Sequence, residues 1–286
     1  MDNYTNTVSR VLAIEPSFLQ QYLDKRKSQS SDKNYKGSIE SLRLLHFSAA
    51  DKISYPWFED VSEGSIALHV IDGPITYNRW WGFSTLDFMH ELRAADANPA
   101  FIAHLIYINS PGGESFGMNE THEVIQNLSK PVYAIIDSVG CSAAYYIASA
   151  ANKVYATSPV SLIGSIGCMA TLTDWSKYDE RLGVKEIELY ATKSTLKNKT
   201  YRDALDGKTK EYIEKLLDPV LELFIDNVKK GRSNVDERVF SGDSYYTPEA
   251  MDLHLVDGIR SLDQVAAELL SLEELKNIGN QITHLF

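Results

Sequence analysis

Apolar residues recur in two alternating patterns through the middle of the chain. Short continuous runs have the length of buried strands, and the segments between them place apolar residues three and four positions apart, as amphipathic helices do. In chain order the predicted elements are strand 66–71, helix 84–95, strand 102–108, helix 117–129, strand 132–136, helix 143–151 and strand 154–156. This alternation is typical of parallel βαβ units with right-handed crossovers, and it predicts an α/β fold with a mostly parallel sheet.

The sequence on either side of this region is less regular. Residues 8–26 form an amphipathic stretch that Pro16 interrupts, and residues 25–41 are charged, serine-rich and poor in apolar side chains, as linkers are. Residues 208–230 keep helical spacing, and a kink is expected at Pro219.

The length of 286 residues is enough for one large domain or two small ones. We divide the chain into an N-terminal segment (1–62) that is partly helical with a flexible linker, a central domain (63–275) and a C-terminal tail (276–286). No internal repeat is visible, so the central domain is expected to hold one unit rather than two in tandem.

The composition narrows the classes of function. A net charge of -11 argues against a nucleic-acid partner, because binding to a phosphate backbone rests on Lys and Arg. Cys141 and Cys168 are expected to be reduced thiols, and the sequence shows no Cys/His cluster for a metal, so we expect no metal and no cofactor. The N-terminus lacks the features of a signal peptide, and no apolar window is long enough to span a membrane. The sequence therefore predicts a cytoplasmic protein without a membrane anchor.

Two turns that follow predicted strands carry the candidate chemistry. The first, Asn109-Ser110-Pro111-Gly112-Gly113, has glycine N–H groups that no side chain shields. The second places the Ser142 hydroxyl between a strand and a helix, among small residues that let a substrate backbone approach. A nucleophile opposite a pair of backbone donors is what acyl transfer to water needs, so these turns indicate a serine peptidase.

A serine hydroxyl is a poor nucleophile until a base takes its proton. No histidine occurs between His122 and His254, and both of these are expected to be surface or packed residues. The alternative base is a lysine whose pKa is lowered by burial. The candidates lie in one short segment and are Lys193, Lys197 and Lys199.

Several further motifs occur in an order and spacing that are specific to one family. Besides the two turns they are 143–147, 150–153, Gly164-Ser165-Ile166-Gly167, Gly231-Arg232, 246–250 and 255–257. From Ile106 to Asp257 the chain thereby resembles the signal peptide peptidase A family of serine proteases. The resemblance implies the Clp protease/crotonase-like fold, with repeated ββα and βαβ units, and makes the central domain a serine peptidase domain.

Carried over to this sequence, the resemblance implies a Ser–Lys dyad. Ser142 is the nucleophile, and Ser165 helps to orient the lysine. The backbone N–H groups of Gly112, Gly113 and Ala143 form the oxyanion hole.

The base is less closely defined than the nucleophile, because Thr192 stands where cellular members of the family have a glycine. Phage-type relatives carry a serine three positions before the lysine and an asparagine just after it. Ser194 and Asn198 fit that arrangement around Lys197, which is therefore the expected base, with Lys199 as the alternative.

The start of the chain, residues 10–16 followed by Phe18-Leu19, looks like that of phage-encoded members, which process capsid or scaffold proteins during head assembly. We accordingly expect a capsid or scaffold protein as substrate, and a homo-oligomeric ring in which neighbouring subunits complete each site. The expected location is the cytoplasm of a bacterium or phage-infected host, or the interior of the prohead. Two alternatives stay open: a crotonase-like enzyme acting on acyl-CoA, and a catalytically silent assembly protein of the same fold.

Overall fold

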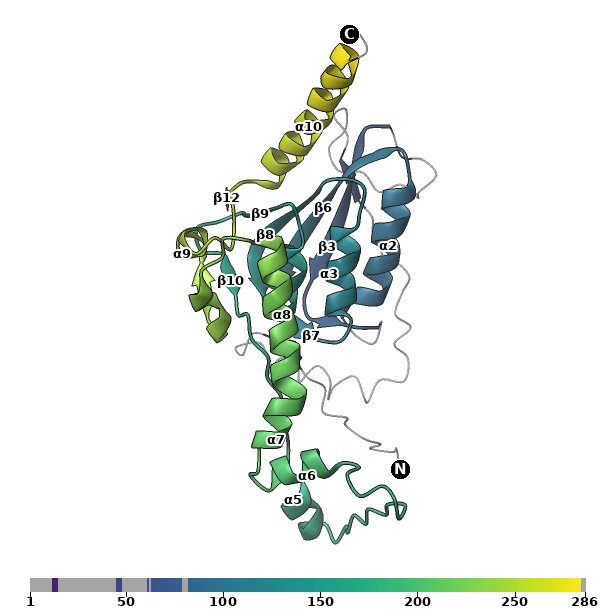
Figure 1. Cartoon of the computed structure of the whole chain (residues 1–286), viewed down its shortest axis with the longest axis vertical. Coiled ribbons are helices and arrows are strands. Elements are labelled where there is room, and N and C mark those ends of the chain that lie inside the picture. Colours follow the sequence, from purple (N-terminus) through teal and green to yellow (C-terminus); the bar gives the residue numbers. More distant parts are fainter. Residues whose placement is uncertain (1–11, 15–44, 48–60, 62, 79–81, 284–286) are drawn as a thin grey trace.

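The computed structural model describes residues 12–14, 45–47, 61, 63–78 and 82–283 (Figure 1). Its largest element is an eight-stranded sheet in which β11, β10, β8, β6, β3 and β2 follow one another, and β9 and β12 pair beside β8. The strands are β2 (Leu45–Phe47), β3 (Ser65–Asp72), β6 (Phe101–Ser110), β8 (Val132–Cys141), β9 (Lys153–Ala156), β10 (Leu162–Gly164), β11 (Ser244–Tyr246) and β12 (Gly258–Ile259). All pairs are parallel except the outer ones made by β2 and β11, which confirms the predicted α/β class.

The predicted alternation of strands and helices is present. The crossover helices are α2 (Thr85–Ala97), α3 (Met118–Gln126) and α4 (Ala143–Ser149). Helix α2 begins where expected because the Ser84 side chain accepts a hydrogen bond from the Asp87 N–H and so satisfies one free donor of the first turn. Strand β8 is longer than predicted. Its first half pairs with β9, and its last residues pair with β10, so the polar pair Asp137-Ser138 lies within the strand instead of ending it.

Helices cover both faces of the main sheet (Figure 1). On one face α2, α3, α4 and α8 (Asp218–Gly231) enclose the larger apolar core. On the other face the first turns of α10 (Leu262–Thr283) pack Val265, Ala266 and Leu269 against β3, β6 and β8. Helix α10 continues to Thr283, past the domain boundary expected at residue 275.

A second, small sheet was not predicted. It contains β1 (Leu12–Ile14), β7 (Gly112–Glu114), β4 (Ile75–Thr76) and β5 (Phe83–Ser84), in that spatial order. The helical prediction is wrong for Leu12–Ile14, because this segment finds its hydrogen bonds on a strand a hundred residues further along the chain. Strand β2 also lies in the N-terminal segment, where no strand was predicted. The rest of the helix and the linker predicted there lies outside the described residues.

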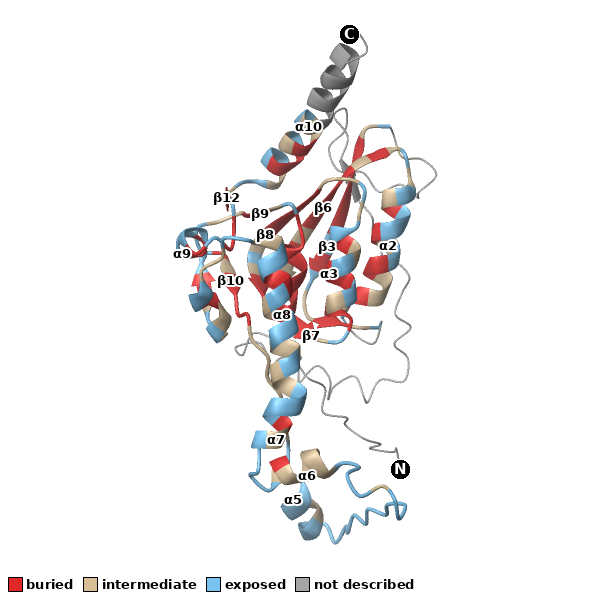
Figure 2. Ribbon diagram, in the orientation of Figure 1, coloured by how far each residue is buried: buried red, intermediate tan, exposed pale blue. Residues whose placement is uncertain are grey.

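A mostly exposed extension leaves the body of the molecule beyond one end of the sheet (Figures 1 and 2). It contains α5 (Ser176–Arg181), α6 (Lys199–Leu205) and α7 (Lys210–Tyr212), and we call residues 176–212 the arm. A π-helical turn, Ile213–Leu217, joins α7 to α8, so the single helix predicted over 208–230 is divided. Pro219 lies in the first turn of α8, directly after the π-helical turn, so the α-helical pattern is interrupted next to the proline.

Candidate active site

Three neighbouring strand ends carry the predicted nucleophile, the glycine turn and the second serine. Strands β6, β8 and β10 are parallel, with Ser110 beside Gly140 and Gly164 beside Cys141. Carboxyl ends of parallel strands meet at one edge of a sheet, where ligands of open α/β folds bind. The structure therefore brings Ser142, Ser165 and Gly112-Gly113 to one edge.

Ser142 has an unusual backbone conformation. Its φ of 56° and ψ of -122° are sparsely populated for a residue with a side chain, and such a conformation costs about 1–3 kcal/mol. The turn is held by hydrogen bonds on both sides: the Ser142 N–H donates to the Gly164 carbonyl at 2.7 Å, and the Tyr146 N–H donates to the Ser142 carbonyl at 2.8 Å. The surrounding structure thus fixes a strained strand-to-helix turn with the serine at its tip.

The Ser142 hydroxyl is buried and has no hydrogen-bond partner among the residues that the structure describes. Leaving a buried hydroxyl unpaired is unfavourable, and such groups are uncommon in folded proteins. Since no described residue binds this hydroxyl, its proton is available to a base.

The glycine turn forms strand β7, which packs against α4 and hence against the start of the helix at Ala143. Gly112 has a φ of 99°, in the region that favours glycine, and its N–H donates to Ser110 Oγ at 3.1 Å. A Cβ atom on Gly113 would lie 1.9 Å from the Ile75 carbonyl oxygen, so no side chain fits there. The three predicted oxyanion-hole residues therefore lie beside the Ser142 turn, on backbone that only glycine can supply at two positions.

Ser165 occupies the position after β10 that Ser142 occupies after β8. Its φ is also positive, at 50°, and its N–H donates to the Asp243 carbonyl at 2.7 Å. The side chain is buried, at 4% exposure. Two serines in strained turns on adjacent strands are therefore neighbours, as an orienting role for Ser165 requires.

Comparison with known proteins identifies the family. The model of peptidase family S49 matches residues 125–276, which include the Ser142 turn and the Ser165 turn. The chain belongs to peptidase family S49. A Clp protease model also matches residues 85–164, which agrees with the expected Clp-like fold.

Three proteins are similar to this chain over part of their length. The chain is 28% identical to serine protease SPPA, chloroplastic, of Arabidopsis thaliana over 63% of its own length and 27% of the relative. It is 28% identical to head-tail preconnector protein GP5 of Enterobacteria phage P21 over 48% of its length and 27% of the relative. It is 26% identical to capsid assembly protease C of Escherichia phage lambda over 65% of its length and 43% of the relative. The chain thus spans less than half the length of each of these three proteins.

The candidate lysines are not beside Ser142 in the described part of the chain. Lys193 and Lys197 lie in the arm, in the exposed loop before α6, and α6 itself lies beyond the end of the sheet and apart from β8 (Figure 1). The loop turns sharply after Lys197, because Asn198 adopts a left-handed conformation with a φ of 57°. No ion pair of Lys197 is found with any described residue, and its side chain is exposed.

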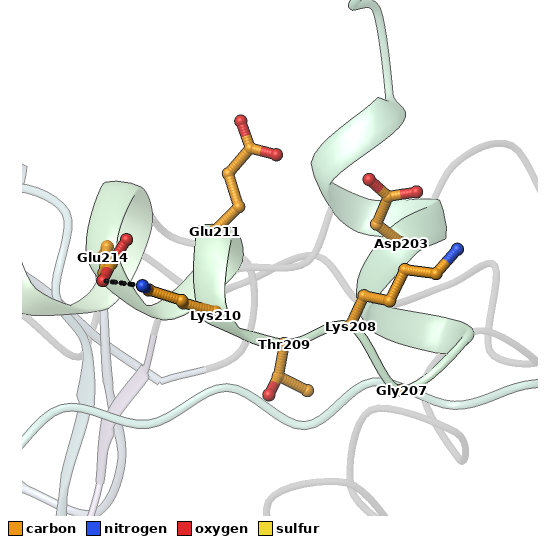
Figure 3. A pocket seen from close by; sticks show the side chains of 7 residues that line it. All are labelled: Asp203, Gly207, Lys208, Thr209, Lys210, Glu211 and Glu214. Carbon is orange, nitrogen blue, oxygen red and sulfur yellow. Dashed lines mark ion pairs between the residues drawn. The ribbon is translucent and has the colours of Figure 1, made fainter.

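Lys199 is engaged by carboxylates. Its ammonium pairs with Asp203 and lies 3.5 Å from a Glu211 oxygen, and the hydrogen bond to Asp203 is the main reason that the pKa of Lys199 is raised. Both acids line a surface hollow of about 400 Å³ at the turn between α6 and α7 (Figure 3). The other residues around it are Gly207, Lys208, Thr209, Lys210 and Glu214, with Lys210 paired to Glu214 at 3.6 Å. A lysine held as a cation by two acids is a poor base, so this arrangement favours Lys197 over Lys199.

The two histidines that were considered as bases lie as expected. His122 is fully buried on α3 with its ring beside that of Tyr146, and His254 is exposed in the turn after α9 (Thr247–Asp252). Burial lowers the pKa of His122 to about 4, with Lys230 contributing, so this imidazole is neutral at neutral pH. Among the described residues, no hydrogen bond joins either histidine to Ser142, so neither is a candidate for its base.

Within the described residues there is no group of three or more His, Cys, Asp or Glu side chains that could hold a metal ion. Neither Cys141 nor Cys168 forms a disulfide with a described residue. In the same part of the chain, no helix has the length and apolar character needed to cross a membrane.

Proposed function

We propose that this protein is a serine endopeptidase in which Ser142 is the nucleophile and Lys197 is the general base. The proposal rests mainly on the Ser142 turn. A strained backbone there presents a buried hydroxyl with no hydrogen-bond partner among the described residues, beside a strand whose first two positions require glycine. Membership of peptidase family S49 supports the same activity.

The proposed reaction passes through an acyl-enzyme. Neutral Lys197 takes the proton of Ser142 Oγ as this oxygen forms a bond to the carbonyl carbon of the substrate. Backbone N–H groups of Gly112 or Gly113 and of Ala143 stabilise the negative oxygen that develops. The lysine then gives its proton to the leaving amine as the peptide bond breaks. A water molecule, deprotonated by the same lysine, hydrolyses the ester and returns Ser142 to its initial state.

Lys197 has to be neutral to act, and burial against apolar surface is what lowers the pKa of an ammonium group. It is exposed in the single chain, so the proposal includes a second copy that covers the arm. The arm has the apolar surface for such a contact. Its exposed large apolar side chains are Tyr178, Leu182, Val184, Ile187, Leu189, Tyr190 and Leu196. We therefore place Lys197 of one subunit beside Ser142 of its neighbour, within a homo-oligomeric ring.

Mixing two inactive variants tests this arrangement. Ser142→Ala and Lys197→Ala each remove one member of the dyad, and subunits of the two kinds are exchanged by mild dissociation and reassembly. Random mixing in a ring pairs an intact serine with an intact lysine in about a quarter of the sites, so about a quarter of wild-type peptidase activity is expected to return. No recovery in co-assembled rings would mean that the base acts within one chain or is another residue.

A capsid or scaffold protein is the proposed substrate, and the cytoplasm of an infected cell or the prohead is the proposed location. Similarity to a phage capsid assembly protease and a phage head-tail preconnector protein supports this setting. The N-terminal sequencing of proteins from assembled particles provides the test. New N-termini that are absent when Ser142→Ala replaces the wild type are expected, and identical termini in both particles would contradict the assignment.

A further inference from the structure

The strand beside the glycine turn belongs to the chain's own N-terminal segment. Strand β1 pairs antiparallel with β7, and the opposed residues are Leu12 and Glu114, Ala13 and Gly113, and Ile14 and Gly112. On its other side β7 pairs with β4. Without β1, β7 would be the edge strand of the small sheet. An open strand edge next to a nucleophile is a surface to which an extended peptide binds by adding a strand.

The register gives β1 a direction relative to Ser142. Because the pairing is antiparallel, β1 runs from Glu114 towards Gly112, and its last residue, Ile14, lies at the glycine turn. This end of β7 directly follows strand β6. The last residue of β6, Ser110, pairs with Gly140 of β8, which comes shortly before Ser142. A peptide in this direction brings the carbonyl at its C-terminal end towards the nucleophile, as the acyl side of a substrate must.

We propose that Leu12–Ile14 is a built-in competitor of the peptide substrate. It occupies the edge of β7 along which the residues before the scissile bond would pair, so substrate has to displace β1 before Ser142 can be acylated. The inference rests on the proposed function, because it takes Ser142 as the nucleophile. Strand β7 binds β1 through main-chain hydrogen bonds, so an extended peptide of suitable length can take the place of β1.

Proline substitutions in β1 test the competition in the full-length protein. In an antiparallel ladder alternate residues donate their N–H groups to the partner, so either Ala13 or the pair Leu12 and Ile14 donates to β7. Proline has no N–H to donate. The variants are therefore Ala13→Pro and the double variant Leu12→Pro/Ile14→Pro. The matched control is His46→Pro, in β2, which pairs with β3 at the far edge of the main sheet.

The rate at which a fluorophosphonate labels Ser142 is the readout, with Ser142→Ala as the unlabelled reference. Loss of one or two main-chain hydrogen bonds is expected to raise the labelling rate about tenfold in at least one β1 variant. The His46→Pro variant is expected to label at the wild-type rate. A synthetic peptide with the sequence of residues 8–14, added to the faster variant, is expected to slow it again.

The labelling results distinguish failure of this inference from failure of the proposed function. Equal or slower labelling of both β1 variants, or the same acceleration in His46→Pro, would overturn the inference and leave Ser142 as the nucleophile. Absence of labelling in every chain, wild type included, would contradict the proposed function itself.

A second measurement does not depend on the proline variants folding. Hydrogen–deuterium exchange at residues 12–14 is followed in Ser142→Ala, which cannot consume substrate, with and without a saturating peptide. Faster exchange when peptide is bound is expected, because bound peptide displaces β1. Unchanged exchange at saturation would show that the two do not share the edge of β7 and would overturn the inference.

Discussion

Replacing His122 by leucine is expected to make the protein less sensitive to acid. The imidazole is fully buried on α3. Desolvation, assisted by Lys230, lowers its pKa from 6.5 in the unfolded chain to about 4 in the folded protein. The unfolded chain therefore binds a proton first as the pH falls. Stability linked to His122 is fully present above pH 6.5 and is lost progressively as the pH falls towards 4.

These two pKa values give the size of the effect. Between pH 7.5 and pH 5.0, protonation of His122 in the unfolded chain is expected to reduce the free energy of unfolding by about 2 kcal/mol. The His122→Leu variant lacks this contribution. Its loss of stability over the same interval should therefore be smaller than that of the wild type by about 2 kcal/mol, whatever the substitution does to stability at neutral pH.

Urea unfolding at a series of pH values measures the difference, since the midpoints and slopes give the free energy at each pH. The variant His90→Leu is the control, because His90 is an exposed histidine on α2. Parallel pH profiles for the wild type and His122→Leu would refute the reasoning, because they would show that His122 binds protons equally well in the folded and unfolded states.

Two further substitutions test the packing around the site. Phe224 is buried and stacks on Tyr146 with ring centroids 4.4 Å apart. Phe224→Ala should therefore lower the free energy of unfolding, measured in urea, by about 3–5 kcal/mol. Leu223→Ala, at an exposed position of the same helix, is the control and should have a much smaller effect. The Arg232 guanidinium is nearly buried and donates to Asp257 at 2.9 Å. Loss of hydrogen bonds between charged groups in Asp257→Ala should cost about 2 kcal/mol by the same assay, and wild-type stability in that variant would show that the pair contributes nothing.

The sequence predicts the main sheet well because its strands are locally distinct. Strands β3, β6 and β8 are covered by helices on both faces, so they are rich in apolar residues, and the helices between them carry one apolar face. The small sheet has no such signal. Strands β1, β4, β5 and β7 contain two or three residues each, and they exist because distant segments satisfy one another's hydrogen bonds. Pairing of this kind cannot be read from a local pattern.

The candidate site likewise contains residues that a local sequence pattern reveals and one that it does not. Ser142 and the glycine turn are recognisable from sequence, because a strained turn and a close backbone approach each restrict the residue type locally. The proposed base is not, because the pKa of a lysine depends on what covers it, and Lys197 is exposed in the part of the chain that the structure describes. The preference for Lys197 over Lys199 depends on the positions of Asp203 and Glu211 beside Lys199, which only the fold provides.

The central claim is that Ser142 is a nucleophile activated by Lys197. Its most direct test is intact-mass spectrometry of the assembled protein after treatment with a fluorophosphonate, followed by peptide mapping of the adduct. We expect a single adduct on Ser142 in the wild type and in Lys199→Ala, and none in Ser142→Ala or Lys197→Ala. An assembled wild type that gains no adduct, or gains it at another residue, would show that Ser142 is not an activated nucleophile and would favour a catalytically silent assembly protein.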